Sequence, residues 1–299
     1  MAAVITSQSL GLYHSSLTQT GQTFGGLGQL GNQGNHLYVN ASTGNLIVQQ
    51  QDELLKSLGI DQSLIRTYNS QGQFSDDNGD NWRLNVHQKV NVAALTGTVN
   101  TVGSSISKTQ GDGSTHSYRY DAALGKYIAT AGEGAHDTLS FNASTNEWTW
   151  TDGTNGITEV YDGTTGKLLS HRDSDGYTTT YRYTGDLLVS MTDGSGQTSY
   201  FDYSVNNLTQ IRTESQGVEQ TRVRYSYDSE DRLTQVTVDL SPEDNDISDG
   251  NTYITTYRYD GTSKRITRIT SGDGTAVSFA YVLDNGQYKV ATVTDGLLY

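Results

Sequence analysis

The chain has 299 residues, of which 33 are acidic and 19 are basic, so its formal net charge is −14. This charge argues against nucleic acid and anionic membranes as partners, because both require basic surfaces. No stretch approaches the roughly 18 apolar residues of a membrane-spanning helix. The N-terminus lacks the basic and apolar regions of a conventional signal peptide. The absence of Cys excludes disulfides and thiol chemistry.

Residues 1–35 are rich in Gly, Gln, Ser and Thr. This composition predicts a flexible Gly/Gln-rich leader. The alternative is an extended arm that packs against a sheet, since the segment contains apolar residues that could be buried. These residues are Leu10, Leu12, Leu17, Phe24, Leu27 and Leu30.

Residues 36–107 are expected to form a β segment that precedes the repeats. Two short apolar runs flank the turn formers Asn40–Asn45, which predicts a hairpin. Leu64–Tyr68 is a further expected strand. Between them, Asp52–Leu58 is expected to form one or two helical turns that end at Gly59.

Residues 108–299 contain a pattern that returns in units of about 18 to 24 residues, a spacing typical of repeat architectures. In each unit a turn precedes a Tyr-rich strand, and a second turn precedes a second apolar strand. Of the 20 Tyr residues, 17 lie at or after Tyr118. The expected Asp-Gly turns are Asp175-Gly176, Asp193-Gly194, Asp249-Gly250, Asp273-Gly274 and Asp295-Gly296. The Tyr-rich strands contain Tyr181-Arg-Tyr183, Tyr200-Phe-Asp-Tyr203, Tyr225-Ser-Tyr227, Tyr257-Arg-Tyr259 and Phe279-Ala-Tyr281.

Each unit of this pattern predicts a β-hairpin. Asp-Gly supplies the positive φ that a tight turn needs. Tyr-x-Tyr places both rings on one face of a strand, because side chains alternate with period two. A lone hairpin is too small to be stable, so the hairpins must lie side by side. The predicted fold is all-β: tandem hairpin repeats in one continuous, curved or spiral antiparallel sheet that forms a partial shell.

The apolar strands depart from simple alternation. Their buried-type residues are three apart, which is odd parity for a strand. We expect either a β-bulge or a Leu that belongs to the turn and packs over its end. The pairs are Leu208 and Ile211, Leu233 and Val236, and Ile266 and Ile269.

An acidic insertion near residues 239–250 lengthens one turn and leaves the repeat on either side in register. Its oxygen-rich side chains make Asp244, Asp246 and Asp249 weak candidates for calcium binding. The segment does not match the twelve-residue loop with a terminal bidentate Glu. The alternative is that these residues are acidic turn formers, and no cofactor is otherwise expected.

Three Trp residues are weak candidates for binding a ligand. Trp82, Trp148 and Trp150 could stack on sugar rings. The alternative is that Trp148 and Trp150 form a half-buried cross-strand pair. The six His residues are scattered and no catalytic motif is present, so we assign no catalytic residue and expect no enzyme activity.

Four units carry a Tyr-Asp pair, and the segment before them contains Asn40–Leu46, Ile65–Ser70 and Asn81–Asn85. Together these features make residues 36–299 resemble the YD-repeat proteins of the RHS family. Some positions depart from the pattern, since Tyr183 and Tyr281 lack the following Asp. The pairs are Tyr120-Asp121, Tyr161-Asp162, Tyr227-Asp228 and Tyr259-Asp260.

The resemblance implies a β-sheet strip that spirals into a hollow shell, which in toxin complexes encloses a cytotoxic C-terminal cargo. About seven units would form only an arc of such a wall. The chain therefore resembles the N-terminal portion of an RHS polymorphic toxin, a toxin-complex shell or a teneurin-like protein. We expect a non-enzymatic shell or scaffold segment that helps to enclose or deliver a C-terminal toxic or effector domain. Its expected partner is the remainder of its own polypeptide or an encapsulated effector.

The alternative function is a cell-surface adhesion module that uses its aromatic-rich sheet to bind a glycan or a surface protein. Either function implies a secreted or cell-surface bacterial protein, exported without a conventional signal peptide. The open edge of the sheet near Val290–Val293 is expected to self-associate, because unpaired strand edges pair with other strands. The sequence leaves open which sheet face is the inner one.

Overall fold

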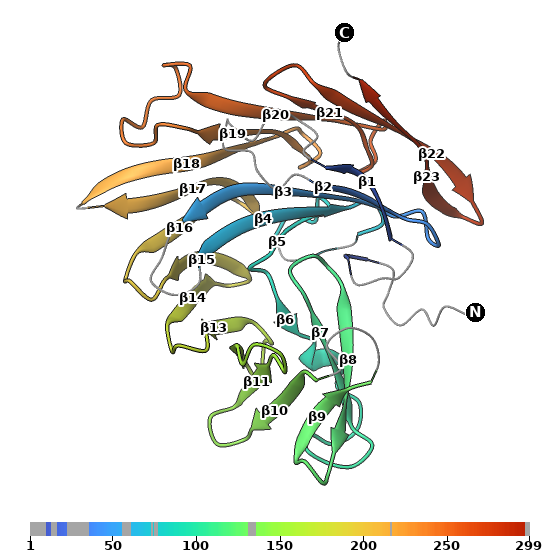
Figure 1. Ribbon diagram of the computed structural model, residues 1–299, viewed down its shortest axis with the longest axis vertical. Helices are drawn as coiled ribbons and strands as arrows, with labels where there is room; N and C mark the ends of the chain where they lie inside the picture. Colours follow the sequence, from blue (N-terminus) through green and yellow to red (C-terminus); the bar gives the residue numbers. More distant parts are fainter. Residues whose placement is uncertain are drawn as a thin grey trace.

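The computed structural model describes residues 10–12, 17–22, 36–55, 61–72, 74, 77–130, 136–215 and 217–296. Within these ranges the chain is all-β, with one short 3₁₀ turn, η2 (Val92–Ala94). The strands form two antiparallel sheets (Figure 1). We call the five-stranded sheet β1–β5 the opening sheet and the 18-stranded sheet β6–β23 the repeat strip.

The two sheets divide between Leu84 and Lys89. The opening sheet consists of β1 (Leu17–Gln22), β2 (His36–Asn40), β3 (Leu46–Leu55), β4 (Gln62–Asn69) and β5 (Trp82–Leu84). The first half of the repeat strip consists of β6 (Lys89–Val90), β7 (Ser105–Thr109), β8 (Thr115–Asp121), β9 (Lys126–Ala129), β10 (Thr138–Asn142), β11 (Glu147–Thr151), β12 (Thr158–Asp162), β13 (Leu168–Arg172) and β14 (Thr178–Thr184). The second half consists of β15 (Leu187–Thr192), β16 (Thr198–Ser204), β17 (Asn207–Ser215), β18 (Val218–Tyr227), β19 (Leu233–Asp239), β20 (Thr252–Tyr259), β21 (Ile266–Ser271), β22 (Ala276–Asp284) and β23 (Gln287–Gly296).

The repeat strip is one continuous sheet, because each of its strands pairs with the next in sequence. At its start the strip curls, and the Val90 N–H donates to the Gly166 carbonyl at 2.9 Å, which brings β6 against the turn before β13. The strip is otherwise open, since β23 pairs with β22 and, among the strands described, with no other. In Figure 1 the strip bends around the opening sheet, which lies inside the curve. The predicted continuous, curved antiparallel sheet is confirmed.

The Tyr-x-Tyr strands place both rings on the inner face, as the alternation predicts. Tyr181 and Tyr257 are buried, whereas Arg182 and Arg258 between the paired rings are exposed. In β16 the inner residue is Phe201 and not Tyr200, because Tyr200 stands three residues from Tyr203 and therefore faces outward. The structure thus identifies the concave face, which the sequence leaves open.

The expected β-bulges are present in the apolar strands. In β19, Tyr227 pairs with Leu233 and Ser226 pairs with Gln235, so Thr234 is the extra residue. The Thr234 hydroxyl donates to the Ser226 carbonyl across the pair at 3.0 Å. Equivalent register shifts occur in β17 and β21, where Thr209 and Thr267 are the extra residues. The bulge restores parity and lets both apolar residues of each strand face inward.

Three sequence predictions about local structure are wrong. Asp295-Gly296 does not form a turn, because β23 continues through Gly296. The helical turns expected over Asp52–Leu58 are absent up to Leu55, because β3 extends that far, and residues 56–60 lie outside the described chain. In the turn after Asp193, the residue with positive φ is Gly196 and not Gly194.

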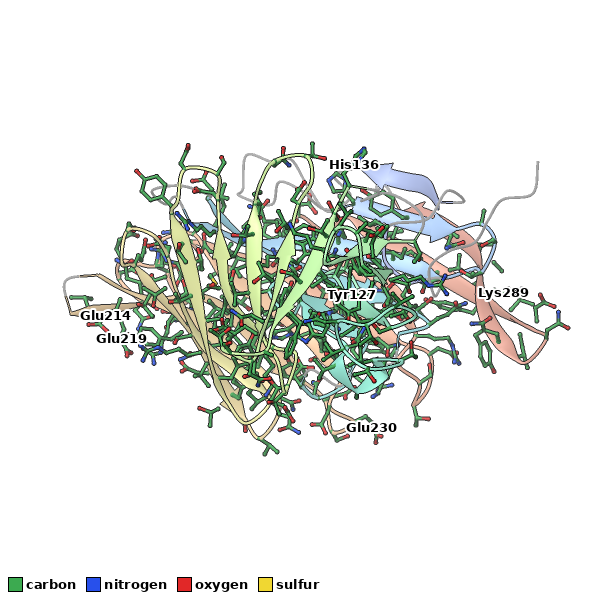
Figure 2. All side chains as sticks on the ribbon, turned by 90° about the horizontal axis from the view of Figure 1, so that it is seen from below. Tyr127, His136, Glu214, Glu219, Glu230 and Lys289 are labelled. Atoms are coloured by element: carbon green, nitrogen blue, oxygen red, sulfur yellow. The ribbon has the colours of Figure 1, made fainter. Side chains whose placement is uncertain are left out.

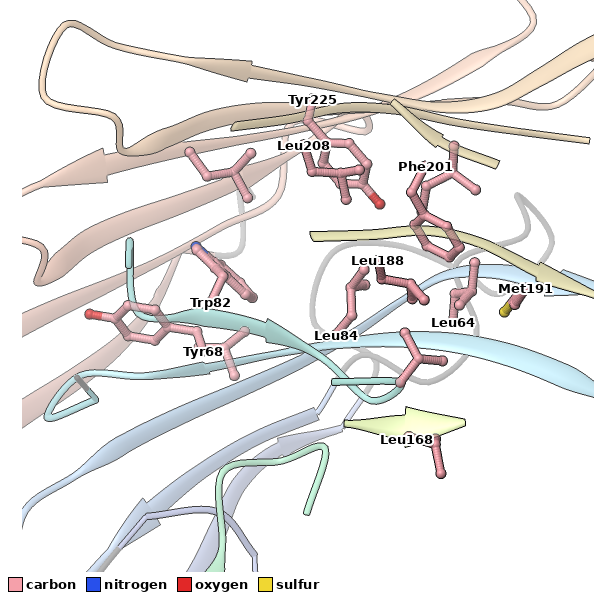
Figure 3. Close-up of a cluster of buried hydrophobic side chains, with 14 of the residues drawn as sticks. Leu64, Tyr68, Trp82, Leu84, Leu168, Leu188, Met191, Phe201, Leu208 and Tyr225 are labelled. Carbon is pink, nitrogen blue, oxygen red and sulfur yellow. The ribbon is translucent and has the colours of Figure 1, made fainter. Parts of the chain in front are cut away.

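One part of the core lies between the opening sheet and the concave face of the repeat strip (Figure 3). Another part consists of residues from the curled start of the strip, such as Tyr118, Tyr127 and Trp148. Tyr225, Leu208 and Phe201 point inward from the strip, opposite Trp82 and Leu84 of the opening sheet. Burial of such apolar area stabilises the packed sheets by about 25 cal/mol per Å². The opening sheet is therefore the second layer of the fold.

Charged side chains collect at the hairpin ends. Figure 2 shows Glu214, Glu219 and Glu230 projecting from the periphery, whereas Tyr127 points into the interior. The side chain of Tyr127 is fully buried. Among the helical segments described, none is long and apolar enough to cross a membrane.

The segment predicted as a leader is described only at residues 10–12 and 17–22. Its strand β1 pairs with β2, and the Gly11 N–H donates to the Asn69 Oδ1 at 2.9 Å. The Leu12 N–H donates to the Asp112 Oδ2 at 2.7 Å. The apolar residues Phe24, Leu27 and Leu30 lie outside the described chain. The division into three regions at residues 35 and 107 stays a prediction.

Candidate functional site: the seam between the opening sheet and the repeat strip

Consecutive hairpins of the strip pair over only part of their length. For example, β21 and β22 pair over three residues, from Arg268 to Thr270, and then separate towards the second Tyr of the unit. The separation leaves main-chain groups that need other partners. We call each such position a notch. A notch consists of two main-chain groups: the N–H of the apolar residue that pairs with the second Tyr of the unit, and the carbonyl of the residue two positions before that apolar residue.

Tyr hydroxyl groups bridge the separated hairpins. The Tyr259 hydroxyl donates to the Leu233 carbonyl of the preceding hairpin at 2.6 Å. The Tyr281 hydroxyl donates in the same way to the Ile266 carbonyl at 2.9 Å. A Phe at either position would fill the space but leave the carbonyl without this donor.

The opening sheet contacts three successive notches. At the middle one, the Tyr68 hydroxyl donates to the Lys264 carbonyl at 2.9 Å and accepts from the Ile266 N–H at 3.0 Å. At the preceding one, the Asn78 Nδ2 donates to the Asp231 carbonyl at 3.0 Å. The opening sheet is therefore held by main-chain atoms of the strip, and the surface formed by these contacts is the seam.

The third notch lies on β23. The Gln71 Nε2 donates to the Tyr288 carbonyl at 3.1 Å, and the Val290 N–H donates to the Gly44 carbonyl at 2.9 Å. A Cβ atom on Gly44 would lie 2.4 Å from the Cβ of Lys289, so only Gly permits this approach. The turn between β2 and β3 thus covers part of β23, the strand that contains Val290–Val293. The self-association expected at this edge stays a prediction.

A buried ion pair lies at the centre of the seam. Arg66 and Asp52 are each 4% exposed, and the guanidinium meets the carboxylate through Nε at 2.8 Å and Nη2 at 3.0 Å. Burial alone would lower the pKa of Arg66, and the Asp52 carboxylate holds that pKa well above its usual value. The guanidinium carbon lies 4.2 Å from the centroid of the Trp82 ring. This pair belongs entirely to the opening sheet.

Two Tyr hydroxyls of the strip complete the polar environment of this pair. The Tyr225 hydroxyl donates to the Asp52 Oδ2 at 2.7 Å. The Arg66 Nη2 donates to the Tyr257 hydroxyl at 3.1 Å, and that hydroxyl donates to the Gln50 Oε1. Burial raises the pKa of both phenols, so both stay protonated and can donate. The cluster joins the two sheets by hydrogen bonds that need hydroxyl groups on the strip.

A second buried ion pair lies inside the curled start of the strip. Lys108 is fully buried, and its Nζ lies 2.7 Å from the Glu159 carboxylate. The same Nζ donates to the Gln88 and Gln110 side-chain carbonyls at 2.8 and 2.7 Å. Burial lowers the pKa of Lys108, against the opposing effect of Glu159. This cluster holds the curl together rather than facing solvent.

The structure buries the three Trp residues proposed as ligand platforms. Trp82 is 3% exposed, Trp148 is 2% exposed and Trp150 is 8% exposed. The Trp82 ring packs on Tyr257, with ring centroids 5.2 Å apart. The Lys108 Nζ lies 4.0 Å from the centroid of the Trp150 ring. A sugar could not stack on these rings without displacing this packing.

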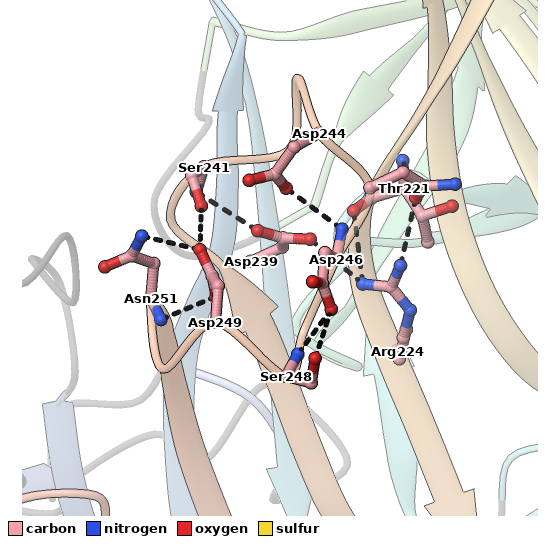
Figure 4. A network of polar contacts seen from close by, with 10 residues as sticks. Thr221, Arg224, Asp239, Ser241, Asp244, Asp246, Ser248, Asp249 and Asn251 are labelled. Carbon is pink, nitrogen blue, oxygen red and sulfur yellow. Dashed lines mark hydrogen bonds and ion pairs between the residues drawn. The ribbon is translucent and has the colours of Figure 1, made fainter.

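The calcium candidates lie in the acidic insertion, and each carboxylate accepts hydrogen bonds within its own loop (Figure 4). Asp244 accepts from the Asp246 N–H at 2.9 Å, and Asp246 accepts from the Ser248 N–H at 2.8 Å. Asp249 accepts from the Ser241 hydroxyl at 3.0 Å. The described residues contain no cluster of three or more His, Asp or Glu side chains that could hold a metal ion. Calcium binding stays a prediction.

Sequence reasoning missed the charged residues of both buried clusters, because it assigned Asp and Glu to exposed turns. The signal that could have found them is strand parity. Arg66 has the same parity as Leu64 and Tyr68, so all three side chains lie on the inward face of β4. Likewise, Glu159 shares parity with Tyr161 in β12. A charge at an inward position requires a buried partner.

Asp80 gives the seam a pH dependence. Burial raises its pKa to about 6, although the Trp82 N–H donates to its Oδ1 at 2.9 Å. The folded protein therefore binds more protons than the unfolded chain between pH of about 4 and 6, and stability falls as pH rises through this window. Asp80→Asn keeps an acceptor for the Trp82 N–H and cannot ionise. We expect this variant to be more stable at pH 7 by up to about 3 kcal/mol, with little difference near pH 4.

The measurement is urea unfolding of both proteins at the two pH values. A difference in the free energy of unfolding that does not change with pH would contradict a buried, titrating Asp80.

Comparisons with known proteins identify one domain family and several solved structures. The family described as a domain of unknown function, DUF6531, matches residues 38–118, a range that runs from β2 into β8 and so spans both sheets. No curated protein matches the chain. The crystal structure of TcdB2-TccC3-Cdc42 is 13% identical, with a TM-score of 0.35, over 85% of this chain and 16% of that one.

Two further structures are similar to parts of the chain. A Photorhabdus luminescens Tc holotoxin pore is 15% identical, with a TM-score of 0.31, over 85% of this chain and 15% of that one. A porin-like protein from Bacteroides uniformis is 17% identical, with a TM-score of 0.30, over 70% of this chain and 95% of that one. TM-scores this low carry no argument about function. The chain spans about a sixth of the toxin chains that it matches.

Proposed function

We propose that this chain is a non-enzymatic scaffold segment of an RHS/YD-repeat shell, in which the opening sheet occupies the concave face of the repeat strip. In this role it helps to enclose or deliver a C-terminal toxic or effector domain. Its partner is the remainder of its own polypeptide or an encapsulated effector. The role implies secretion or display at a bacterial cell surface.

The observation that carries the proposal is the seam. A continuous, open strip curves around a sheet from the start of the same chain, and that sheet contacts notches on three successive hairpins. Such an arrangement suits one end of a wall, because the opening sheet fills the space that the curve would otherwise leave. The proposal assigns no catalytic residue.

Two of the four Tyr-Asp pairs, Tyr227-Asp228 and Tyr259-Asp260, support the same role, because the Asp of each binds an Arg that lies on a Tyr ring of the next hairpin. In Tyr227-Asp228, the carboxylate accepts the Glu230 N–H at 3.0 Å and the Arg232 Nε at 2.9 Å. The Arg232 guanidinium carbon then lies 4.9 Å from the centroid of the Tyr259 ring in the following hairpin. The Asp228 carboxylate therefore stabilises its own turn and holds the Arg232 guanidinium against the Tyr259 ring of the next hairpin. This cation–π contact restricts movement between the two hairpins.

The experiment is limited proteolysis of the polypeptide expressed from its complete coding sequence. The proposal predicts that the part following residue 299 is protected in the whole protein and digested faster when expressed alone. A coding sequence that adds no further domain, or a downstream part digested equally fast in both forms, would contradict enclosure. Saturable binding of the chain to a glycan array would instead favour the adhesion module.

A further inference from the structure

The notch contacts hold the opening sheet but do not distinguish one hairpin from another. They use the carbonyls of Asp231, Lys264 and Tyr288, and main-chain atoms are the same in every unit. Moving the opening sheet by one hairpin would present it with equivalent carbonyls and amides. Other contacts must therefore determine which hairpins it occupies.

The inner aromatic residue differs from hairpin to hairpin. Among the described residues of the strip, only Tyr225 and Tyr257 bring hydroxyls to the cluster of Arg66, Asp52 and Gln50. The units on either side carry Phe, which has no hydroxyl. In chain order, the inner residues from β14 to β22 are Tyr181, Phe201, Tyr225, Tyr257 and Phe279.

A shift by one hairpin in either direction would place a Phe against a buried polar group. Towards β16, Phe201 would replace Tyr225 beside Asp52. Towards β22, Phe279 would replace Tyr257 beside Gln50 and Arg66. Either shift leaves buried donors or acceptors unsatisfied, which is costly in a dry interior.

We propose that the adjacent hydroxyls of Tyr225 and Tyr257 determine the register of the opening sheet on the repeat strip. The main-chain notches supply contacts common to all units, and the order of Tyr and Phe along the inner face selects one position. This inference concerns where the opening sheet sits and does not depend on the scaffold role.

The test is amide hydrogen exchange of the full chain at Ile266 and Val290, whose N–H groups donate across the seam to Tyr68 and Gly44. Phe201→Tyr creates four consecutive inner Tyr residues, from Tyr181 to Tyr257, and so permits a second register, one hairpin towards β16. In that register the Gly44 carbonyl would accept the Ile266 N–H, and the Val290 N–H would have no acceptor from the opening sheet. We expect exchange at Val290 to rise about tenfold or more while Ile266 stays protected.

This selectivity separates register from general destabilisation. If Phe201→Tyr raises exchange equally at both amides, or changes neither, the proposal is wrong. In the opposite direction, Tyr225→Phe and Tyr257→Phe should each raise exchange at both amides about tenfold, because a hydrogen bond within the buried charged cluster is lost. The matched control is Tyr181→Phe, which removes an inner hydroxyl away from the cluster and should change neither.

Amides of β10 and β11, which lie in another part of the strip, report whether a variant remains folded. Unchanged exchange at Ile266 and Val290 in both Tyr225→Phe and Tyr257→Phe would also overturn the proposal.

Discussion

Arg66→Met should lower the free energy of unfolding by about 3–5 kcal/mol, because it leaves a buried carboxylate without its cation. Asp52 is 4% exposed, and the one donor that it would keep among the described residues is the Tyr225 hydroxyl at 2.7 Å. Met fills much of the volume of the Arg side chain, so the loss reports the charge and its hydrogen bonds more than a cavity. Urea unfolding followed by fluorescence measures the effect.

The double variant Arg66→Met with Asp52→Leu is the matched control. Replacing both members of a buried ion pair with apolar residues is often neutral or stabilising, so the second change should recover most of the loss. If the double variant is as unstable as the sum of the two single variants, the pair does not act as a unit, and the account of the seam centre fails.

Lys108→Met should have an effect of similar size, about 3–5 kcal/mol, at the other buried ion pair. Lys108 is fully buried, and its loss removes the cation 2.7 Å from Glu159 and the donor to Gln88 and Gln110. Glu159 would then retain the hydroxyl of Tyr161 as its remaining described donor. The measurement is again urea unfolding.

Lys108→Met combined with Glu159→Gln provides the control, because it removes both charges and leaves the Tyr161 hydroxyl an acceptor. This double variant should recover much of the stability. A Lys108→Met protein that unfolds at the same urea concentration as the unaltered chain would show that the curl does not depend on this pair.

Local features of the strip could be predicted from the sequence because they depend on periodicity. The Tyr-x-Tyr strands, and the bulges that place both Leu233 and Val236 inward, follow from alternation of side chains. The failures are also local. Asp52–Leu55 has the composition of a helical turn. However, Asp52 forms an ion pair with Arg66 of the neighbouring strand, and this tertiary contact outweighs the local preference for a helix.

The seam could not be predicted in the same way, because its contacts join residues far apart in the chain and use main-chain atoms. Tyr68 and Lys264, for example, are 196 positions apart. A side-chain pattern carries no information about which carbonyls are left unpaired where two hairpins separate. The sequence shows which inner positions carry Phe and which carry Tyr. The difference between them matters only where the Tyr hydroxyl bonds Asp52 or Arg66, and those contacts are known only from the structure.

The central claim is that the opening sheet sits against the concave face of the repeat strip, and thiol cross-linking tests it most directly. The chain contains no Cys, so Asn78→Cys and Asn207→Cys would introduce its only two thiols. In the native chain the Asn78 Nδ2 lies 2.7 Å from the Asn207 Oδ1. We predict that a short thiol-reactive cross-linker closes a loop within one chain, that denaturant abolishes the product, and that neither single variant forms it. A folded double variant that reacts at both thiols without linking them would contradict the account.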